Sequence, residues 1–274
     1  MTAIANWVNK ENNQKSIWTI GDTKISDLSS KTSLSLESSK IFELQIICKD
    51  ISGHPEKREK YYHHSIGFAF AGSSLVGLNC YATLNTILSN LGGTKDEIPD
   101  IKSIASIVSK VVDYYSKSIC SNGNNFEALT YGFCHKSFKF KRFYISKKNK
   151  LNDIVYSEEE IEDESIIYLI GDKKVEIAEE IKNQMKFLEN EKNLDYWRTP
   201  LKVMSEIITS GKYESIGGGT QLNIATIIGC NPYQSVGEKE MSSMKFRNID
   251  VHYDIGHQVG NCIIAIDGMD FRMR

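Results

Sequence analysis

Residues 66–93 read IGFAFAGSSLVGLNCYATLNTILSNLGG and change from a strand pattern to a helix pattern at one point. The apolar run up to Gly72 is typical of a short buried strand, and from Ser73 the apolar residues recur at helical spacing. Gly92 and Gly93 then end the helix. A strand that passes directly into a helix leaves backbone N–H groups at the junction, where a developing negative charge can be held.

The elements around this junction follow one another in blocks. Residues 2–26 contain two strand patterns around a polar turn, which predicts a hairpin. After a first pair of helices come further strands, then a second helix pair within residues 176–211, then strands again. Helices paired between blocks of strands predict a layered α+β fold and not a βαβ alternation. We expect one domain over residues 1–230, with residues 231–274 as an extension packed on it.

Charge and composition exclude several classes of partner. The 274-residue chain carries 33 Lys and Arg against 35 Asp and Glu, and this formal net charge of −2 predicts neither nucleic acid nor an anionic membrane as a partner. Its apolar runs are too short or too rich in glycine to span a bilayer, and residues 1–15 lack the pattern of a secretory signal. The six cysteines show no CxxC spacing, which predicts reduced thiols and a cytoplasmic location.

The second residue is a threonine, and methionine is normally removed when a small residue follows it. Removal of Met1 would leave Thr2 with a free α-amino group, whose ordinary pKa is about 7.7–8.0. A hydroxyl is a poor nucleophile until a base takes its proton, and an amine of this pKa suits that task at neutral pH. Thr2 is therefore a candidate nucleophile.

Three further positions lie at strand ends where they can meet Thr2. Asp22 ends the strand that returns from the first turn, so the predicted hairpin brings it back beside Thr2. Lys40 begins the next strand, and Gly72 closes the strand that passes into the helix. Turn-closing aspartates and strand-edge lysines are common for structural reasons alone. Their joint order around Thr2 is what favours a catalytic site.

These motifs resemble those of a known family. An N-terminal threonine, a strand ending in Gly21-Asp22, a strand-opening Lys40 and an Ala71-Gly72-Ser73 turn into a long helix are similar to features of proteasome β-subunits. They also resemble the peptidase subunit of bacterial ATP-dependent two-component proteases. The resemblance continues to the glycine run at 217–219 and covers about residues 2–230 in element order. It implies a four-layer αββα sandwich, the fold of N-terminal nucleophile hydrolases.

The resemblance also implies a role for each of these residues. The hydroxyl of Thr2 would be the nucleophile and its α-amino group the base, while Lys40 would lower the pKa of one or both by its charge. Asp22 would hold Lys40 through an ion pair, and the backbone N–H of Gly72 would stabilise the oxyanion. The substrate pocket in the family lies near the lysine and the glycine turn, which here suggests an apolar pocket formed by Phe42, Phe70 and Ser74.

Three segments depart from the family pattern. The family has a serine after the glycine of a later strand-to-helix turn, where this chain has Asp172. It has Asp-x-x-Ser before the late glycines, where this chain has Glu214 and Ser215. We expect Asp172 and Glu214 to belong to the catalytic site, with Glu214 supplying the carboxylate; the hydroxyl is missing unless Ser215 supplies it. Residues 49–65 form a charged insertion, which we expect to be an exposed loop with His63-His64 on the surface.

Together these features predict a cytoplasmic threonine endopeptidase that cleaves polypeptides through an acyl-enzyme ester at Thr2, without a cofactor. By resemblance it would work in a ring of identical subunits, and because the chain has no P-loop, unfolding energy would come from a separate ATPase. Two alternatives stay open. One is a catalytically silent assembly subunit with the same fold, and the other is a hydrolase of a small amide with the same nucleophile.

One other pattern bears on metal binding. Asp250, His252 and Asp254 alternate along a strand-like stretch and can share one face, with His257 just beyond. Carboxylate and imidazole together can bind a divalent metal. A solvated strand face explains the same alternation, so we expect no metal site.

Overall fold

The computed structural model divides the chain into two compact units. It describes residues 2–26, 32–52, 58–119, 126–150, 153–161, 167–189, 193–236, 244–247, 249–251, 253–256 and 258–271. The first unit comprises Met1–Ile41, Ile166–Ile224 and Pro232–Arg274, and the second comprises Phe42–Ser165 and Ala225–Asn231.

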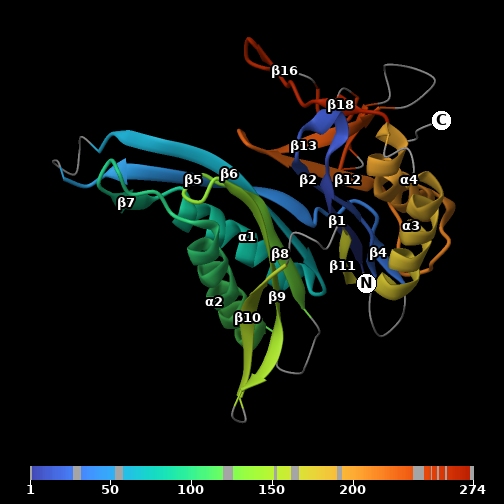
Figure 1. Ribbon diagram of the computed structural model, residues 1–274, viewed down its shortest axis with the longest axis horizontal. Helices are drawn as coiled ribbons and strands as arrows, with labels where there is room; N and C mark the ends of the chain where they lie inside the picture. Colours follow the sequence, from blue (N-terminus) through green and yellow to red (C-terminus); the bar gives the residue numbers. More distant parts are fainter. Residues whose placement is uncertain are drawn as a thin grey trace. The chain divides into compact units, whose positions relative to one another are not determined.

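The first unit is built on a mixed sheet of eight described strands with two helices. The strands run in the order β11 (Ile167–Gly171), β1 (Ala3–Asn9), β2 (Ser16–Asp22), β12 (Thr220–Thr226), β13 (Gly229–Val236), β14 (Met244–Phe246) and β15 (Ile249–Asp250), with β18 (Gly268–Met269) paired to β13. The helices are α3 (Lys174–Leu188) and α4 (Leu194–Ser210), which lie side by side (Figure 1). Two short pairs, β3 (Ile25–Ser26) with β4 (Ser33–Ser35) and β16 (Gln258–Val259) with β17 (Cys262–Ile263), lie outside this sheet.

The hairpin of β1 and β2 is the centre of this unit. Every residue of both strands is buried, and the register pairs Ile4 with Gly21 across the hairpin. Trp7 and Trp18 pack into one core cluster with the apolar faces of α3 and α4. Since β11 lies on the other side of β1, the chain start is held between two neighbouring strands.

The second unit pairs another sheet with two helices. Its strands run in the order β10 (Asp153–Glu160), β9 (Lys139–Lys150), β8 (Glu127–Cys134), β6 (Lys60–Ala71), β5 (Ile41–Asp50) and β7 (Leu91–Gly93). Helices α1 (Ser74–Leu88) and α2 (Ile101–Ile119) lie side by side along this sheet (Figure 1). Gly77 brings α1 close to β6, because a Cβ there would lie only 2.3 Å from the ring of Phe70.

The structure confirms the predicted α+β class, with four α-helices in the described residues. The junction in residues 66–93 is a strand that ends at Ala71 and a helix that begins at Ser74, with the Ser73 hydroxyl as its N-cap. The domain boundary at residue 230 stays a prediction. Within the ranges that can be described, no helix combines the length and the apolar character needed to cross a membrane.

The expectation of an exposed loop over residues 49–65 is wrong at both ends. Strand β5 continues to Asp50 and β6 begins at Lys60, so part of the insertion extends two neighbouring strands of the sheet; residues 53–57 lie outside the described residues. The charged residues in this segment masked the strand pattern in the sequence, because a long strand pair can carry polar side chains on its solvated face. His64 is consequently buried at 4% exposed, whereas His63 is exposed as expected.

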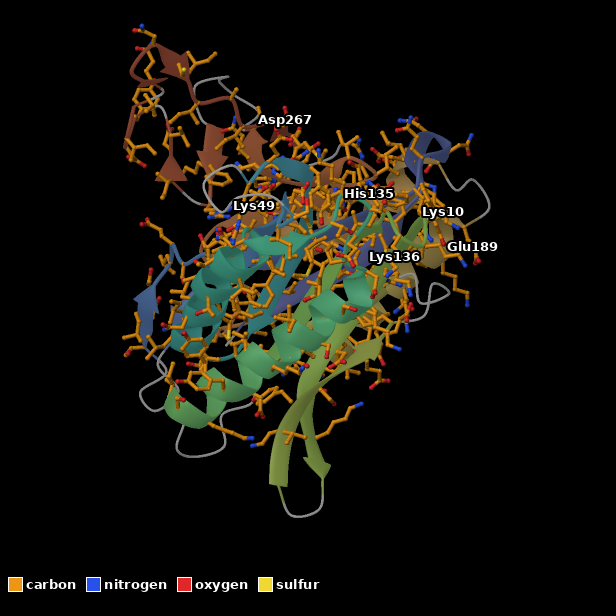
Figure 2. The ribbon with its side chains drawn as sticks, turned by 90° about the vertical axis from the view of Figure 1, so that its left-hand side faces the viewer. Lys10, Lys49, His135, Lys136, Glu189 and Asp267 are labelled. Atoms are coloured by element: carbon orange, nitrogen blue, oxygen red, sulfur yellow. The ribbon has the colours of Figure 1, made fainter. Side chains whose placement is uncertain are left out.

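His64 is held uncharged by its surroundings in the second unit. Its Nε2 donates to the carbonyl oxygen of Phe133 at 3.0 Å. Its ring centroid lies 4.3 Å from that of His135, the residue that directly follows β8 and is labelled in Figure 2. Burial lowers the pKa of His64 to about 4, and the neighbouring His135 acts in the same direction. A proton on this ring would therefore oppose folding.

We expect acid to destabilise the protein through protonation of His64. The unfolded chain binds a proton on this histidine near its ordinary pKa of about 6.5, whereas the folded chain binds it only near pH 4. The stability that the uncharged ring contributes is thus complete above pH 6.5 and is lost as the pH falls towards 4, by at most about 3 kcal/mol. Urea unfolding at several pH values should show a shallower loss for His64→Gln. The control His63→Gln should change the slope much less, because His63 lowers the pKa of His64 by less than burial and His135 do.

Candidate functional site

A buried carboxylate organises the start of the first unit. Asp22 ends β2, is 0% exposed, and accepts four hydrogen bonds. Its Oδ1 accepts from the backbone N–H of Ala3 at 3.0 Å, and its Oδ2 accepts from the backbone N–H groups of Lys24 at 3.1 Å and Gly217 at 3.4 Å. The fourth donor is the side chain of Lys40, whose Nζ lies 3.2 Å from Oδ2. The carboxylate therefore joins the residue next to Thr2 to a lysine ammonium.

Lys40 is almost as deeply buried as its partner. It directly precedes β5, and its Nζ donates both to Asp22 and to the carbonyl oxygen of Lys24. Burial lowers the pKa of Lys40, while the negative charge of Asp22 acts in the opposite direction and raises it. Burial likewise raises the pKa of Asp22, opposed first by Lys40 and then by the N–H groups of Ala3 and Gly217. Each charge thus depends on the other, because both side chains are buried and solvent does not compensate for the loss of either partner.

Thr2 directly precedes Ala3, the residue whose N–H donates to Asp22. Its carbonyl oxygen accepts from the N–H of Asp172 at 2.7 Å, so the strand pairing of β1 with β11 extends to the chain start. Thr2 is 4% exposed, and its nitrogen is an amide while Met1 is attached. Met1, whose removal the sequence predicted, lies outside the described residues.

The two loops that depart from the family pattern meet each other. Asp172, just after β11, accepts a short hydrogen bond on its Oδ2 from the hydroxyl of Ser215. Its Oδ1 accepts from the N–H of Lys173 at 3.0 Å. Glu214 is exposed, and its backbone carbonyl accepts from the ammonium of Lys24 at 2.7 Å. The carboxylate and hydroxyl that come together are therefore those of Asp172 and Ser215. The sequence had offered Ser215 as a substitute hydroxyl but did not include it among the predicted site residues.

A glycine segment closes the site from the other side. The N–H of Thr23 donates to the carbonyl of Gly219 at 3.0 Å, and the N–H of Gly219 donates to the Thr23 hydroxyl at 2.6 Å. Gly218 has φ 79°, and a Cβ there would lie 2.4 Å from the carbonyl oxygen of Leu36 and 2.5 Å from the Thr23 hydroxyl. This segment needs glycine because both its backbone conformation and its close contact exclude a side chain.

The remaining predicted residues belong to the second unit. Gly72 is exposed with φ 119°, a conformation that favours glycine, and it directly precedes the Ser73 cap of α1. Ser74 is half-buried in the first turn of α1. Phe42 and Phe70 lie in the core of this unit, with their rings stacked 6.1 Å apart. Whether these residues form an oxyanion site and a substrate pocket stays a prediction.

Two of the alternating acidic residues near the C-terminus contact each other. The carboxylate of Asp254 accepts from the backbone N–H of Asp250 at 2.8 Å, and His252 and His257 lie outside the described residues. No group of three or more His, Cys, Asp or Glu that could hold a metal ion occurs in the part of the chain that the structure describes.

Of the comparisons with known proteins, the one with solved structures finds likenesses, and these bear on the fold. No family model matches the chain, and no curated protein is similar to it in sequence. Among solved structures, Anbu from Pseudomonas aeruginosa, described as a helical assembly, shares 11% identity at a TM-score of 0.55 over 88% of each chain. Anbu from Yersinia bercovieri, described as an ancestral beta-subunit, shares 12% identity at a TM-score of 0.53 over 82% of each chain. A Gly-1 mutant of Anbu from Hyphomicrobium sp. strain MC1 shares 14% identity at a TM-score of 0.53 over 84% of each chain.

These likenesses show that the chain shares the fold of Anbu. The family expected from the sequence, the proteasome β-subunit-like N-terminal nucleophile hydrolases with the two-component peptidase subunits, is therefore corrected. The motifs behind that expectation are short and lie at strand ends, where turn chemistry alone often selects Gly, Asp and Ser. At 11–14% identity the likeness extends to the fold and not to the chemistry.

We expect the buried pair to be sensitive to removal of one partner. Lys40→Met leaves the Asp22 carboxylate without an ammonium in a buried position, which should lower the free energy of unfolding by about 3–5 kcal/mol. The double variant Lys40→Met/Asp22→Asn should recover much of this loss, because no charge is then left unpaired. Lys212→Met, which removes the surface partner of Glu180, should cost less than about 1 kcal/mol. Equal losses for Lys40→Met and Lys212→Met in urea unfolding would contradict this account.

Proposed function

We propose that the protein is a threonine peptidase whose nucleophile is the hydroxyl of Thr2, freed by removal of Met1. The observation that carries the proposal is the Asp22 carboxylate, which accepts from the backbone next to Thr2 and from the Lys40 ammonium. A positive charge held next to a chain start lowers the pKa of the amine that forms there and favours its unprotonated state. The amine can then act as a base at neutral pH.

In this mechanism the reaction passes through an ester. The Thr2 hydroxyl oxygen attacks the peptide carbonyl carbon while the α-amino group takes the hydroxyl proton. The tetrahedral intermediate collapses with transfer of that proton to the departing amine, which leaves an acyl ester on Thr2. A water molecule then attacks the ester while the same amine takes its proton, and the amine returns that proton to the Thr2 oxygen as the ester C–O bond breaks and the acid product leaves. The N–H of Gly72 would stabilise the oxyanion in both halves, and Phe42, Phe70 and Ser74 would lie near the substrate pocket.

The proposal includes a surrounding assembly. Among the described residues each unit contains one large sheet and one helix pair, and the proposed fold for the chain is the four-layer αββα sandwich. A ring of identical subunits in the cytoplasm, with a separate ATPase to unfold polypeptides, would give such a site its substrates. A catalytically silent assembly subunit is the second candidate, and the observation that favours it is the low exposure of Thr2.

Two measurements separate these candidates. Intact mass should show that the purified protein has lost Met1, which converts the Thr2 amide nitrogen into an amine. A peptide epoxyketone or β-lactone probe should then label the wild type and Thr2→Ser, which keeps a hydroxyl, but not Thr2→Ala. Retention of Met1, or equal labelling of Thr2→Ala, would rule out the peptidase and leave the silent subunit.

The contact between Asp172 and Ser215 gives a sharper test of the site. We propose that this pair supports Thr2, because the N–H of Asp172 holds the Thr2 carbonyl while its carboxylate is fixed by the Ser215 hydroxyl. Loss of one hydrogen bond to a charged group costs about 1.5–3 kcal/mol, so Ser215→Ala should slow probe labelling at least about tenfold. Glu214→Gln, next to it and exposed, should stay within about twofold. The opposite order would assign the supporting role to Glu214, as the resemblance implied.

A further inference from the structure

The amide of Gln221 reaches the backbone of both partners of the buried ion pair. Gln221 lies near the start of β12 and is 3% exposed. Its Oε1 accepts from the N–H of Lys40 at 3.0 Å and from the N–H of Ile41 at 3.2 Å. Its Nε2 donates to the carbonyl oxygens of Ser38 at 2.9 Å and Asp22 at 3.4 Å. One side chain therefore bonds to the end of β2 and to the start of β5.

This amide has no spare hydrogen-bonding capacity. A glutamine side chain can accept two hydrogen bonds at its oxygen and donate two from its nitrogen, and all four are made here. The assignment of oxygen and nitrogen is also determined, because a flipped amide would set its NH₂ group against two N–H donors and its oxygen against two carbonyls. Gln221 is consequently fixed in one orientation by its partners.

The position of these bonds matters for the lysine more than for the sheet. A lysine side chain has about 2 kcal/mol of rotamer entropy, so an ammonium is placed accurately only when the backbone from which it extends is fixed. Gln221 fixes that backbone at the N–H of Lys40 itself and at the next residue. Its Nε2 also donates to the backbone carbonyl of Asp22, the carboxylate partner. One amide therefore sets the distance between the two backbone segments that carry the charges.

We propose that Gln221 is the positioning residue of the Lys40–Asp22 pair and thereby of the charge beside Thr2. This role rests on the proposed function, and it acts through the backbone with no contact to substrate. Without the amide, the segment from Ser38 to Ile41 loses three of its bonds to β12, and the lysine ammonium moves away from the Thr2 amine. The pKa of that amine should then rise, because a nearby positive charge is what lowers it.

The test compares Gln221→Met with a matched loss of another buried amide. Methionine keeps the length of glutamine and removes its hydrogen bonds. Asn6→Leu does the same for an asparagine within β1, whose Nδ2 donates to the Thr19 hydroxyl at 2.7 Å. Labelling by the β-lactone probe, measured from pH 6 to 10, should be at least about tenfold slower for Gln221→Met, with its midpoint raised by about half a unit or more. Asn6→Leu should label within about twofold of the wild type at an unchanged midpoint.

A second readout does not depend on catalysis. Hydrogen exchange at the backbone N–H groups of Lys40 and Ile41 should be at least about tenfold faster in Gln221→Met than in Asn6→Leu, because only the former removes their acceptor. If the wild type is not labelled, the proposed function fails and exchange alone decides the positioning role. The proposal is overturned if folded Gln221→Met is labelled at the wild-type rate, or if the two variants exchange the N–H groups of Lys40 and Ile41 at equal rates. Should Gln221→Met not fold by circular dichroism, Gln221→Asn takes its place, since it keeps the amide but is too short to reach both chains.

Discussion

The structure of the first unit depends on one buried ion pair. Two opposite charges that leave water lose several kcal/mol of solvation each, and their attraction offsets this only when their remaining hydrogen bonds are also made. Asp22 meets this requirement with three backbone N–H groups in addition to the Lys40 ammonium. Those donors come from β1, from the residues after β2 and from the glycine segment, so the pair can be buried only where these parts of the chain converge.

This requirement explains the glycine segment. Gly217 must bring its N–H to the carboxylate, and Gly219 must meet Thr23 from both its N–H and its carbonyl. Between them Gly218 passes so close to Leu36 and Thr23 that no side chain fits. The run of three glycines reflects a close approach of backbone to backbone around a charge. A phosphate-binding loop would instead lead into a helix, whereas this segment leads into β12.

Local patterns were enough to predict the elements and part of the site. The change of period at Ser73 placed the end of β6 and the start of α1. The hairpin pattern brought Asp22 back to the chain start. Lys40 could be expected from its place before a strand. Gln221 could not, because nothing near it in sequence differs from an ordinary strand residue, and its four partners lie 180 or more residues away. His64 was misplaced for a related reason, since its burial depends on β8 and not on the charged residues beside it.

The sequence motif predicted Glu214 as the supporting carboxylate, whereas the structure joins Asp172 to Ser215. A buried or half-buried polar cluster must be satisfied as a whole, and the total of donors and acceptors matters more than which loop supplies each. The family pattern expects a hydroxyl after β11 and a carboxylate before the glycines. Here the carboxylate is Asp172 and the hydroxyl is Ser215, and a hydrogen bond between them joins the two loops. Such an exchange leaves the fold intact while it removes the residue identities that a motif requires. The likeness to solved structures at 11–14% identity accordingly extends to the fold alone.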